Sequence, residues 1–167
     1  AVPPGEVATT PAEAEEVAIT QVTETHIHAD FVSGSRELAA RTGAALFLSA
    51  EGGQDWQYAF AREAGAILIR DGDHIMVGNV RIDVVHTPGH TPGGVTFLLG
   101  DDGFFGDSLF KGSVGRTDLG GAAQVYARTL RDTILGLPDS TGVRPGPGPD
   151  TTIREERRRN PLPNGTL

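Results

Sequence analysis

Cysteine is absent from this chain of 167 residues. Without a thiol there is no disulfide, no thiolate metal site and no cysteine nucleophile, so any metal must be held by nitrogen and oxygen ligands. Long apolar runs are also absent, since none approaches the roughly 18 residues that a membrane-spanning helix requires. The first residues contain neither a basic nor an apolar signal region. We therefore expect a soluble, cytoplasmic protein that does not bind membranes.

Basic residues are scarce: 14 Lys and Arg stand against 22 Asp and Glu, which gives a formal net charge of -8. This balance repels a phosphate backbone unless the basic residues gather on one face. The one basic run, residues 154–159, is interrupted by Glu155 and Glu156. On a helix such a mixture favours a solvated face with internal ion pairs, so we expect no nucleic-acid binding.

The chain divides into a lead-in segment, residues 1–16, rich in proline, threonine, alanine and glutamate, and one domain, residues 17–167. Apolar periodicity predicts strands at 17–22, 45–49, 66–69, 75–77, 80–85, 95–99 and 104–105. One helix is predicted to end at Gly43 and another to span 56–64. A third is predicted at 122–136, with Val125, Leu130, Ile134 and Leu135 on its buried side. A last helix is predicted to begin at a Thr152/Glu155 capping box. Gly78-Asn79 indicates a hairpin. The pattern indicates a mixed α/β class.

Two histidines, His26 and His28, follow the first predicted strand. Side chains at i and i+2 of an extended chain point the same way, so both imidazoles, with Asp30 next in the series, can approach one ion. A single His-x-His is more often a pair of polar residues at a strand end than a metal site. The motif therefore needs support from elsewhere in the chain.

That support comes from two distant loops, each of which follows a predicted strand. His90 lies in a loop rich in proline and glycine, and Asp107 follows the strand at 104–105. If these strand ends share one edge of a sheet, four candidate ligands surround one ion. Three imidazoles and a carboxylate suit zinc, whereas two imidazoles and a carboxylate with open positions suit ferrous iron. The sequence allows both.

Four motifs, in this order, resemble those of the metallo-β-lactamase superfamily. They are THIHAD at 25–30, TPGHTPG at 87–93, GDSLF at 106–110 and GRTD at 115–118. Within the superfamily they are most similar to the persulfide dioxygenase branch that is linked to rhodanese domains and to the glyoxalase II branch. The resemblance implies an α/β (α+β) fold, an αββα sandwich, with a metal at one edge of the two sheets held by His26, His28, His90 and Asp107.

Two positions depart from the superfamily pattern. The first motif usually ends in Asp-His and here ends in Asp30-Phe31, and a late Pro-Gly-His-Gly motif has Pro147 in place of its histidine. Both histidines would be ligands of a second metal. Asp30 with a shared Asp107 should hold a second zinc or iron poorly. We therefore expect one metal ion, Fe(II) or Zn(II).

The surviving groups predict three alternative functions. In the favoured one, His26, His90 and Asp107 form a facial set that leaves positions for a persulfide sulfur and for dioxygen, as in oxidation of a glutathione or other low-molecular-weight persulfide. In the second, a zinc-dependent hydrolase cleaves thioesters or related esters, with Asp30 as the catalytic group that orients or deprotonates water. The third is a catalytically silent binding or assembly module.

Two residues beside the motifs are predicted to assist. His86 is expected to hydrogen-bond and orient a neighbouring metal ligand. Arg116 is expected to bind a small anionic thiol-derived substrate, unless it forms a structural ion pair with Asp118.

The first sheet is expected to be incomplete. The resemblance implies a β-hairpin ahead of the His-x-His strand, and residues 1–16 do not form such a pattern. The segment 140–143, which should lead into the late motif, contains a glycine and only one apolar residue and is a weak strand candidate. Because an incomplete sheet leaves an open edge, we expect self-association into a dimer or larger homo-oligomer.

Overall fold

The computed structural model describes residues 15–28, 32–118 and 121–160, and it contains two β-sheets. The first sheet has three parallel strands in the order β1 (Gln21–Thr23), β2 (Ala45–Ser49) and β3 (Ile67–Ile69). The second has six strands in sequence order: β4 (His74–Val77), β5 (Val80–His86), β6 (Val95–Leu99), β7 (Asp102–Gly106), β8 (Gly142–Pro145) and β9 (Thr151–Thr152). Neighbours in the second sheet are antiparallel except β7 and β8, which are parallel.

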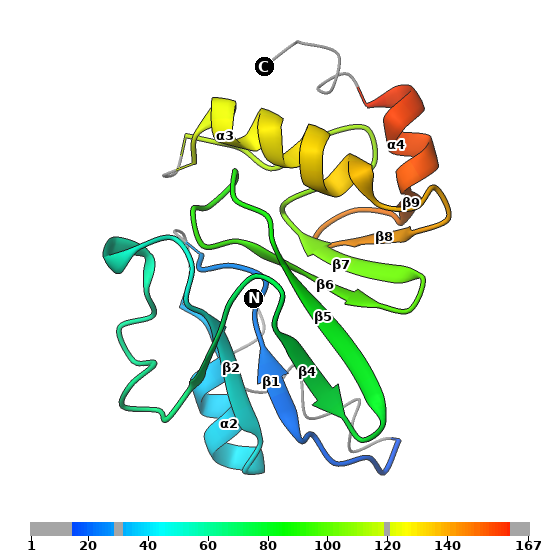
Figure 1. Cartoon of the computed structure of the whole chain (residues 1–167). Coiled ribbons are helices and arrows are strands. Elements are labelled where there is room, and N and C mark those ends of the chain that lie inside the picture. The colour runs from blue at the N-terminus through cyan, green and yellow to red at the C-terminus, as the bar shows by residue number, and fades with distance from the viewer. Residues whose placement is uncertain (1–14, 29–31, 119–120, 161–167) are drawn as a thin grey trace.

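Helices cover the outer face of each sheet (Figure 1). Helix α2 (Ser35–Thr42) packs on the first sheet, against β1 and β2. The second sheet is covered by α3 (Ala123–Arg128), the π-helical turn Thr129–Thr133, the 3-10 turn Ile134–Gly136 and α4 (Ile153–Arg159). The predicted αββα sandwich is thereby confirmed.

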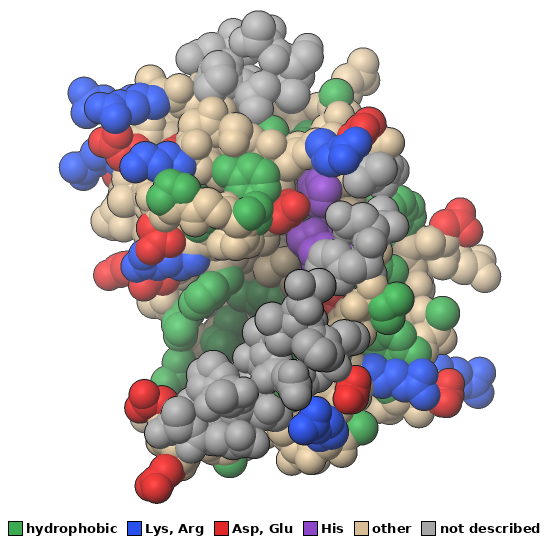
Figure 2. Space-filling model, turned by 180° about the vertical axis from the view of Figure 1, so that it is seen from behind, with side chains coloured by type: hydrophobic (Ala, Val, Ile, Leu, Met, Phe, Trp, Pro, Cys, Tyr) green, Lys and Arg blue, Asp and Glu red, His purple; other side chains and the backbone are tan. Residues whose placement is uncertain are grey.

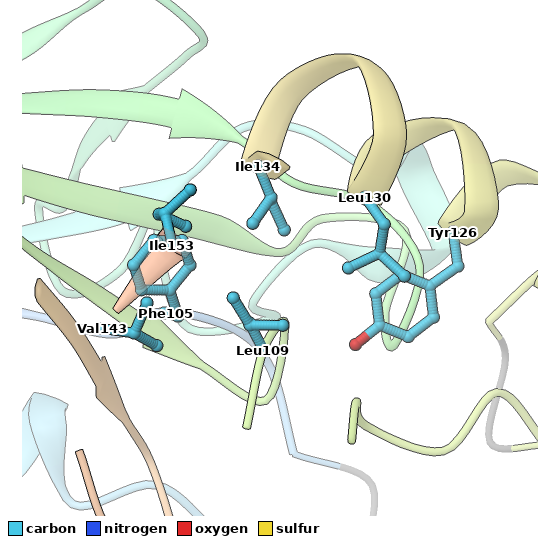
Figure 3. Close-up of a cluster of buried hydrophobic side chains, with 7 residues drawn as sticks. All are labelled: Phe105, Leu109, Tyr126, Leu130, Ile134, Val143 and Ile153. Carbon is cyan, nitrogen blue, oxygen red and sulfur yellow. The ribbon is translucent and has the colours of Figure 1, made fainter. Parts of the chain in front are cut away.

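Three apolar clusters hold the layers together. Between α2 and the first sheet lie Val22, Ala39, Leu46, Leu48, Tyr58 and Ala61. Between the sheets lie Ile69, Ile75, Val84, Val95 and Phe97. Beneath α3 and α4 lie Phe105, Leu109, Tyr126, Leu130, Ile134, Val143 and Ile153 (Figure 3). Burial of apolar surface in such layers is the main favourable term in folding, and here it places the ends of β1, β5 and β7 side by side.

All seven predicted strands form, and all but those at 45–49 and 95–99 have shifted ends. The strand expected at 17–22 is β1, and the weak candidate at 140–143 becomes β8, whose Val143 is fully buried. The hairpin at Gly78-Asn79 is confirmed, with Gly78 at a φ of 62° that favours glycine. Thr152 caps the last helix as predicted, since Glu155 N donates to Thr152 Oγ1 at 3.3 Å, which is the N-cap half of a capping box.

The helix predicted at 56–64 is wrong. A 3-10 turn, Gln54–Trp56, is followed by a series of turns that end at Gly65. Gln57 Nε2 donates to the carbonyls of Ala50 and Glu51, at 3.1 and 3.0 Å, and so fastens the segment to the preceding loop. A side chain that bonds to nearby backbone carbonyls in this way competes with helix formation and supports a compact loop.

The helix predicted at 122–136 exists, but it is interrupted and its buried face is shifted. Leu130 and Ile134 are buried as predicted, whereas Val125 and Leu135 are only half-buried and Tyr126 is fully buried in their stead. A π-helical turn adds a residue to the turn and rotates the face that follows.

Among the described residues, no helix has the length and apolar character needed to cross a bilayer.

Candidate metal site

Three side chains from separate loops converge where β1, β5 and β7 end. His26 follows β1, His90 lies in the loop between β5 and β6, and Asp107 directly follows β7. One ligand atom from each lies within 4.8 Å of those of the other two. His90 Nε2 is 3.7 Å from Asp107 Oδ2, and the His26 and His90 rings meet edge to face with centroids 4.9 Å apart. The three form a set of two imidazoles and one carboxylate.

Backbone contacts between the two sheets place His26 beside the other two residues. Val95 N, at the start of β6, donates to Thr25 O at 2.8 Å. The Thr25 side chain lies against Gly106, where a Cβ would come within 2.3 Å of Thr25 Oγ1. Only glycine allows this approach, and its φ of 52° is also one that other residues rarely adopt.

The His90 imidazole has a defined orientation. Its Nδ1 lies 2.8 Å from the carbonyl oxygen of Arg116, and because a carbonyl only accepts, Nδ1 must donate. In the neutral ring, Nε2 then carries a lone pair directed at the Asp107 carboxylate. A divalent cation could be bound by Nε2 and the carboxylate together, and a histidine whose other ring nitrogen is held by a backbone carbonyl is typical of metal ligands.

His26 contributes a buried ring to the same set. Its exposed fraction is 5%, and its Nδ1 lies 3.0 Å from Thr25 Oγ1. Nε2 is thus the ring nitrogen suited to metal binding. His90 and Asp107 are more accessible, with side chains 13% and 27% exposed, and histidine reaches the molecular surface beside an acidic side chain (Figure 2). A small substrate can therefore reach an ion held here.

Two glycines bring backbone close to the ligands. A Cβ at Gly115 would lie 2.3 Å from Asp107 O and 3.1 Å from the His90 ring, and one at Gly146 would lie 2.9 Å from Asp107 Oδ1. Gly115 N also donates to Asp107 O at 3.1 Å. These contacts surround Asp107 with backbone from two other loops. The donor set and its close packing fit a divalent ion with nitrogen and oxygen ligands.

Tyr126 contacts this region and was not predicted from the sequence. Its one hydroxyl proton is shared between Asp107 O, at 2.8 Å, and Ser108 O, at 2.9 Å, and the hydroxyl oxygen accepts from Gly115 N at 3.0 Å. Burial raises the pKa of the Tyr126 hydroxyl, so it stays protonated and able to donate. The available signal was a tyrosine on a buried helix face, because a buried phenol normally finds a polar partner.

Comparison with known sequences identifies the family. Residues 8–153 match the sequence model of the Metallo-beta-lactamase superfamily. The chain belongs to this superfamily. Its members are mostly metal-dependent hydrolases or oxidoreductases, which agrees with the three converging ligands.

Relatives fall in both branches that the motifs resemble. The structure of ETHE1 from Myxococcus xanthus superposes with a TM-score of 0.83 at 33% identity, covering 95% of this chain and 69% of that one. Hydroxyacylglutathione hydrolase GloC of Haemophilus influenzae is 35% identical over 98 residues, 57% of this chain and 46% of the relative. An uncharacterised protein of Mycobacterium tuberculosis is 45% identical over 117 residues, 64% and 52% of the two chains. The chain spans about half the length of the curated relatives it matches.

The remaining residues of the superfamily motifs take different places. The His28 ring is centred 4.2 Å from that of His26, beside the converging set but not part of it, and His28 remains a predicted ligand. Asp30 and Phe31 lie outside the described residues. Pro147 is exposed in the loop after β8, next to Gly146, which approaches Asp107.

His86 and Arg116 contact the ligand loops in unlike ways. His86 Nε2 donates to Pro92 O at 2.8 Å and so bridges the two ends of the loop that carries His90. The Arg116 side chain is 62% exposed and pairs with Asp118 through two hydrogen bonds, one of them 2.6 Å long. The hydrogen bond from Arg116 lowers the pKa of Asp118 to about 2. The Arg116–Asp118 ion pair, which is the structural alternative to substrate binding by Arg116, is therefore present.

Proposed function

We propose that this chain is a mononuclear metal-dependent enzyme that oxidises a glutathione persulfide or another low-molecular-weight persulfide with dioxygen. The observation that carries the proposal is the convergence of His26, His90 and Asp107 within 4.8 Å. Two imidazoles and one carboxylate on one face, with open positions opposite, are the ligand set of non-haem ferrous oxygenases. The likeness to ETHE1 over 95% of the chain supports the same branch.

His26, His90 and Asp107 would hold the iron, which when bound provides positions for a thiol-derived sulfur and for dioxygen. The protein's own groups keep the site in order. Arg116 O fixes the His90 tautomer, and Gly115 N and the Tyr126 hydroxyl fix the backbone of Asp107. The buried side of the site, around His26, limits water to the exposed face where the substrate enters.

Arg116 is the basic side chain that this proposal assigns to substrate recognition. Its backbone carbonyl is bonded to His90, so its exposed guanidinium projects from the rim of the site. A net charge of -8 disfavours an anionic peptide such as glutathione, and a guanidinium at the rim would offset that repulsion locally. Exchange of the Asp118 carboxylate for a substrate carboxylate preserves the bidentate geometry that arginine prefers.

Zinc-dependent cleavage of a thioester is the second candidate. It is favoured by the identity to hydroxyacylglutathione hydrolase GloC and by the position of the His28 ring, 4.2 Å from His26. A third imidazole would complete a tetrahedral zinc site with the ligands already described. In this candidate Asp30 is proposed to orient or deprotonate the attacking water.

The deciding experiment begins with metal analysis by plasma mass spectrometry on protein purified without added metal. We expect about one equivalent of iron in the natural protein, none in His90→Ala, and an unchanged content in His74→Ala, which removes an exposed histidine on β4. Iron-loaded protein should consume dioxygen when given glutathione persulfide. Zinc with cleavage of hydroxyacylglutathione would establish the hydrolase instead. Absence of metal from all three proteins would refute both and leave a binding or assembly module.

A further inference from the structure

Tyr126 touches the backbone of both loops that carry the more exposed ligands. It projects from α3, on the outer face of the second sheet, and its exposed fraction is 0%. We propose that Tyr126 is a positioning residue that sets the separation of His90 and Asp107 and thereby the affinity and geometry of the bound metal. The inference rests on the proposed metal site and adds a residue to it.

Tyr126 holds the Asp107 loop through its hydroxyl. The Tyr126 hydroxyl shares its one proton between the carbonyls of Asp107 and Ser108 and accepts from Gly115 N. One hydroxyl thus connects the start of the loop that follows β7, at Asp107 and Ser108, with a later part of the same loop, at Gly115. Because the Asp107 carbonyl and carboxylate share one residue, fixing the carbonyl restricts where the carboxylate can lie.

Tyr126 confines the His90 loop through its ring. The Tyr126 ring lies against Gly89, where a Cβ would come within 2.2 Å of the ring. Gly121, just before α3, approaches the same loop, and a Cβ there would lie 2.1 Å from Gly89 O and 2.9 Å from His90 O. The residue before the ligand is therefore pressed on one side by an aromatic ring and on the other by backbone. His90 has little room to retreat from Asp107.

Packing alone would not require the hydroxyl. Figure 3 shows the ring below α3, next to Leu130, in a cluster whose six other members are apolar. A phenylalanine would fill the same space but would remove the donor that the carbonyls of Asp107 and Ser108 share, so that Asp107 O would keep only its bond from Gly115 N among these contacts. The hydroxyl is thus the part of the residue that acts on the metal ligand.

A second link between the same loops limits the expected effect. Thr87 Oγ1, in the loop that leads to His90, lies 3.1 Å from Ser108 Oγ and 3.0 Å from Thr96 Oγ1. This buried hydroxyl chain persists when Tyr126 is changed. We therefore expect a weakened metal site and not a lost one, in the range of 10- to 100-fold that is typical for removal of a group that orients a ligand.

The test compares Tyr126→Phe with Tyr58→Phe in otherwise intact protein. Tyr58 is the other tyrosine of the chain, 6% exposed, and its hydroxyl donates to the Glu24 side chain at 3.3 Å, so the control removes a buried hydroxyl without touching a ligand residue. Co²⁺ is the probe, because its absorption spectrum reports ligand geometry. Its affinity is measured by competition with a chromophoric chelator, and thermal unfolding of the metal-free proteins is recorded in parallel.

Tyr126→Phe should bind Co²⁺ roughly 10- to 100-fold more weakly, with an altered absorption band, while Tyr58→Phe keeps the natural affinity and spectrum. Natural affinity and spectrum in Tyr126→Phe would overturn the inference, as would an equal loss in Tyr58→Phe. No substrate enters this test. A protein that binds Co²⁺ as expected but acts on neither persulfide nor thioester would contradict the proposed function and leave the role of Tyr126 standing, whereas no Co²⁺ binding by the natural protein would overturn both.

Discussion

Replacing Gly115 by alanine should damage the metal site while leaving the fold in place. The added Cβ would lie 2.3 Å from Asp107 O and 3.1 Å from the His90 ring. Real Cβ atoms essentially never come closer than 3.0 Å to such a neighbour, so the oxygen must retreat by about 0.7 Å. That carbonyl belongs to a predicted ligand and also accepts from Gly115 N and from Tyr126.

The size of the effect follows from the cost of overpacking. One extra methyl group in a filled site costs about 1–3 kcal/mol. If the Asp107 loop moves to relieve the clash, this cost falls on metal binding, where it corresponds to roughly a 5- to 150-fold loss of affinity. Gly136→Ala is the matched control, because a Cβ there has no neighbour within 4 Å and its φ is not positive. It should be neutral or slightly stabilising, by up to about 1 kcal/mol.

The assay is competition between each protein and a chromophoric chelator for Zn²⁺, with thermal unfolding of the metal-free proteins as the measure of fold. Gly115→Ala should release Zn²⁺ at much lower chelator concentration than the natural protein or Gly136→Ala. An affinity within twofold of the natural one would refute the reasoning that backbone contact at Gly115 holds Asp107 in place.

Three further predictions concern stability and substrate binding. Removing the metal with a chelator should lower Tm by about 5–11 °C. An ion whose free concentration is 100 times its Kd stabilises the folded chain by about 2.7 kcal/mol, and each kcal/mol shifts Tm by about 2–4 °C in a chain of this size. An unchanged Tm would argue against a bound ion. Glu156→Leu should cost about 1–3 kcal/mol in chemical denaturation, because the buried Glu156 side chain accepts from Gly112 N and Asn160 Nδ2 and a leucine removes that acceptor; natural stability would contradict this. Arg116→Ala should change Tm little, because an exposed ion pair contributes little to stability, and the small change should be the same from pH 5 to 8. The pKa of Asp118, lowered from 3.8 to about 2, keeps its carboxylate charged over that range, so any contribution of the pair is lost only below pH 3.8, as the pH falls toward 2. The same variant should raise KM for glutathione persulfide with little change in kcat, and an unchanged KM would remove Arg116 from substrate binding.

Elements with a strong local signal could be predicted from the sequence. The strand at 45–49 has the predicted bounds, and the Gly78-Asn79 hairpin and the Thr152 cap form as expected. In each case a few neighbouring residues decide the conformation. The ligand loops were found for a related reason: polar residues followed three predicted strands, and strand ends meet at sheet edges.

Features that depend on tertiary contacts were not predictable in this way. The segment 56–64 has helical spacing, but hydrogen bonds from Gln57 to an earlier loop hold it in turns. Tyr126 was missed because its partners, Asp107 and Gly115, lie 19 and 11 residues away along the chain. The periodicity of a helix shows which face is buried, but not which distant carbonyls that face will meet.

The origin of the ligands in different sheets makes metal binding a property of the assembled domain. His26 belongs to the first sheet, whereas His90 and Asp107 follow strands of the second, and the chain passes from one sheet to the other between β3 and β4. Two fragments separated in that connection, near residues 70–73, would each hold an incomplete ligand set. Neither fragment should retain the ion alone, and the ion should favour their reassembly, so that the metal would link two halves that each contain an apolar cluster of their own.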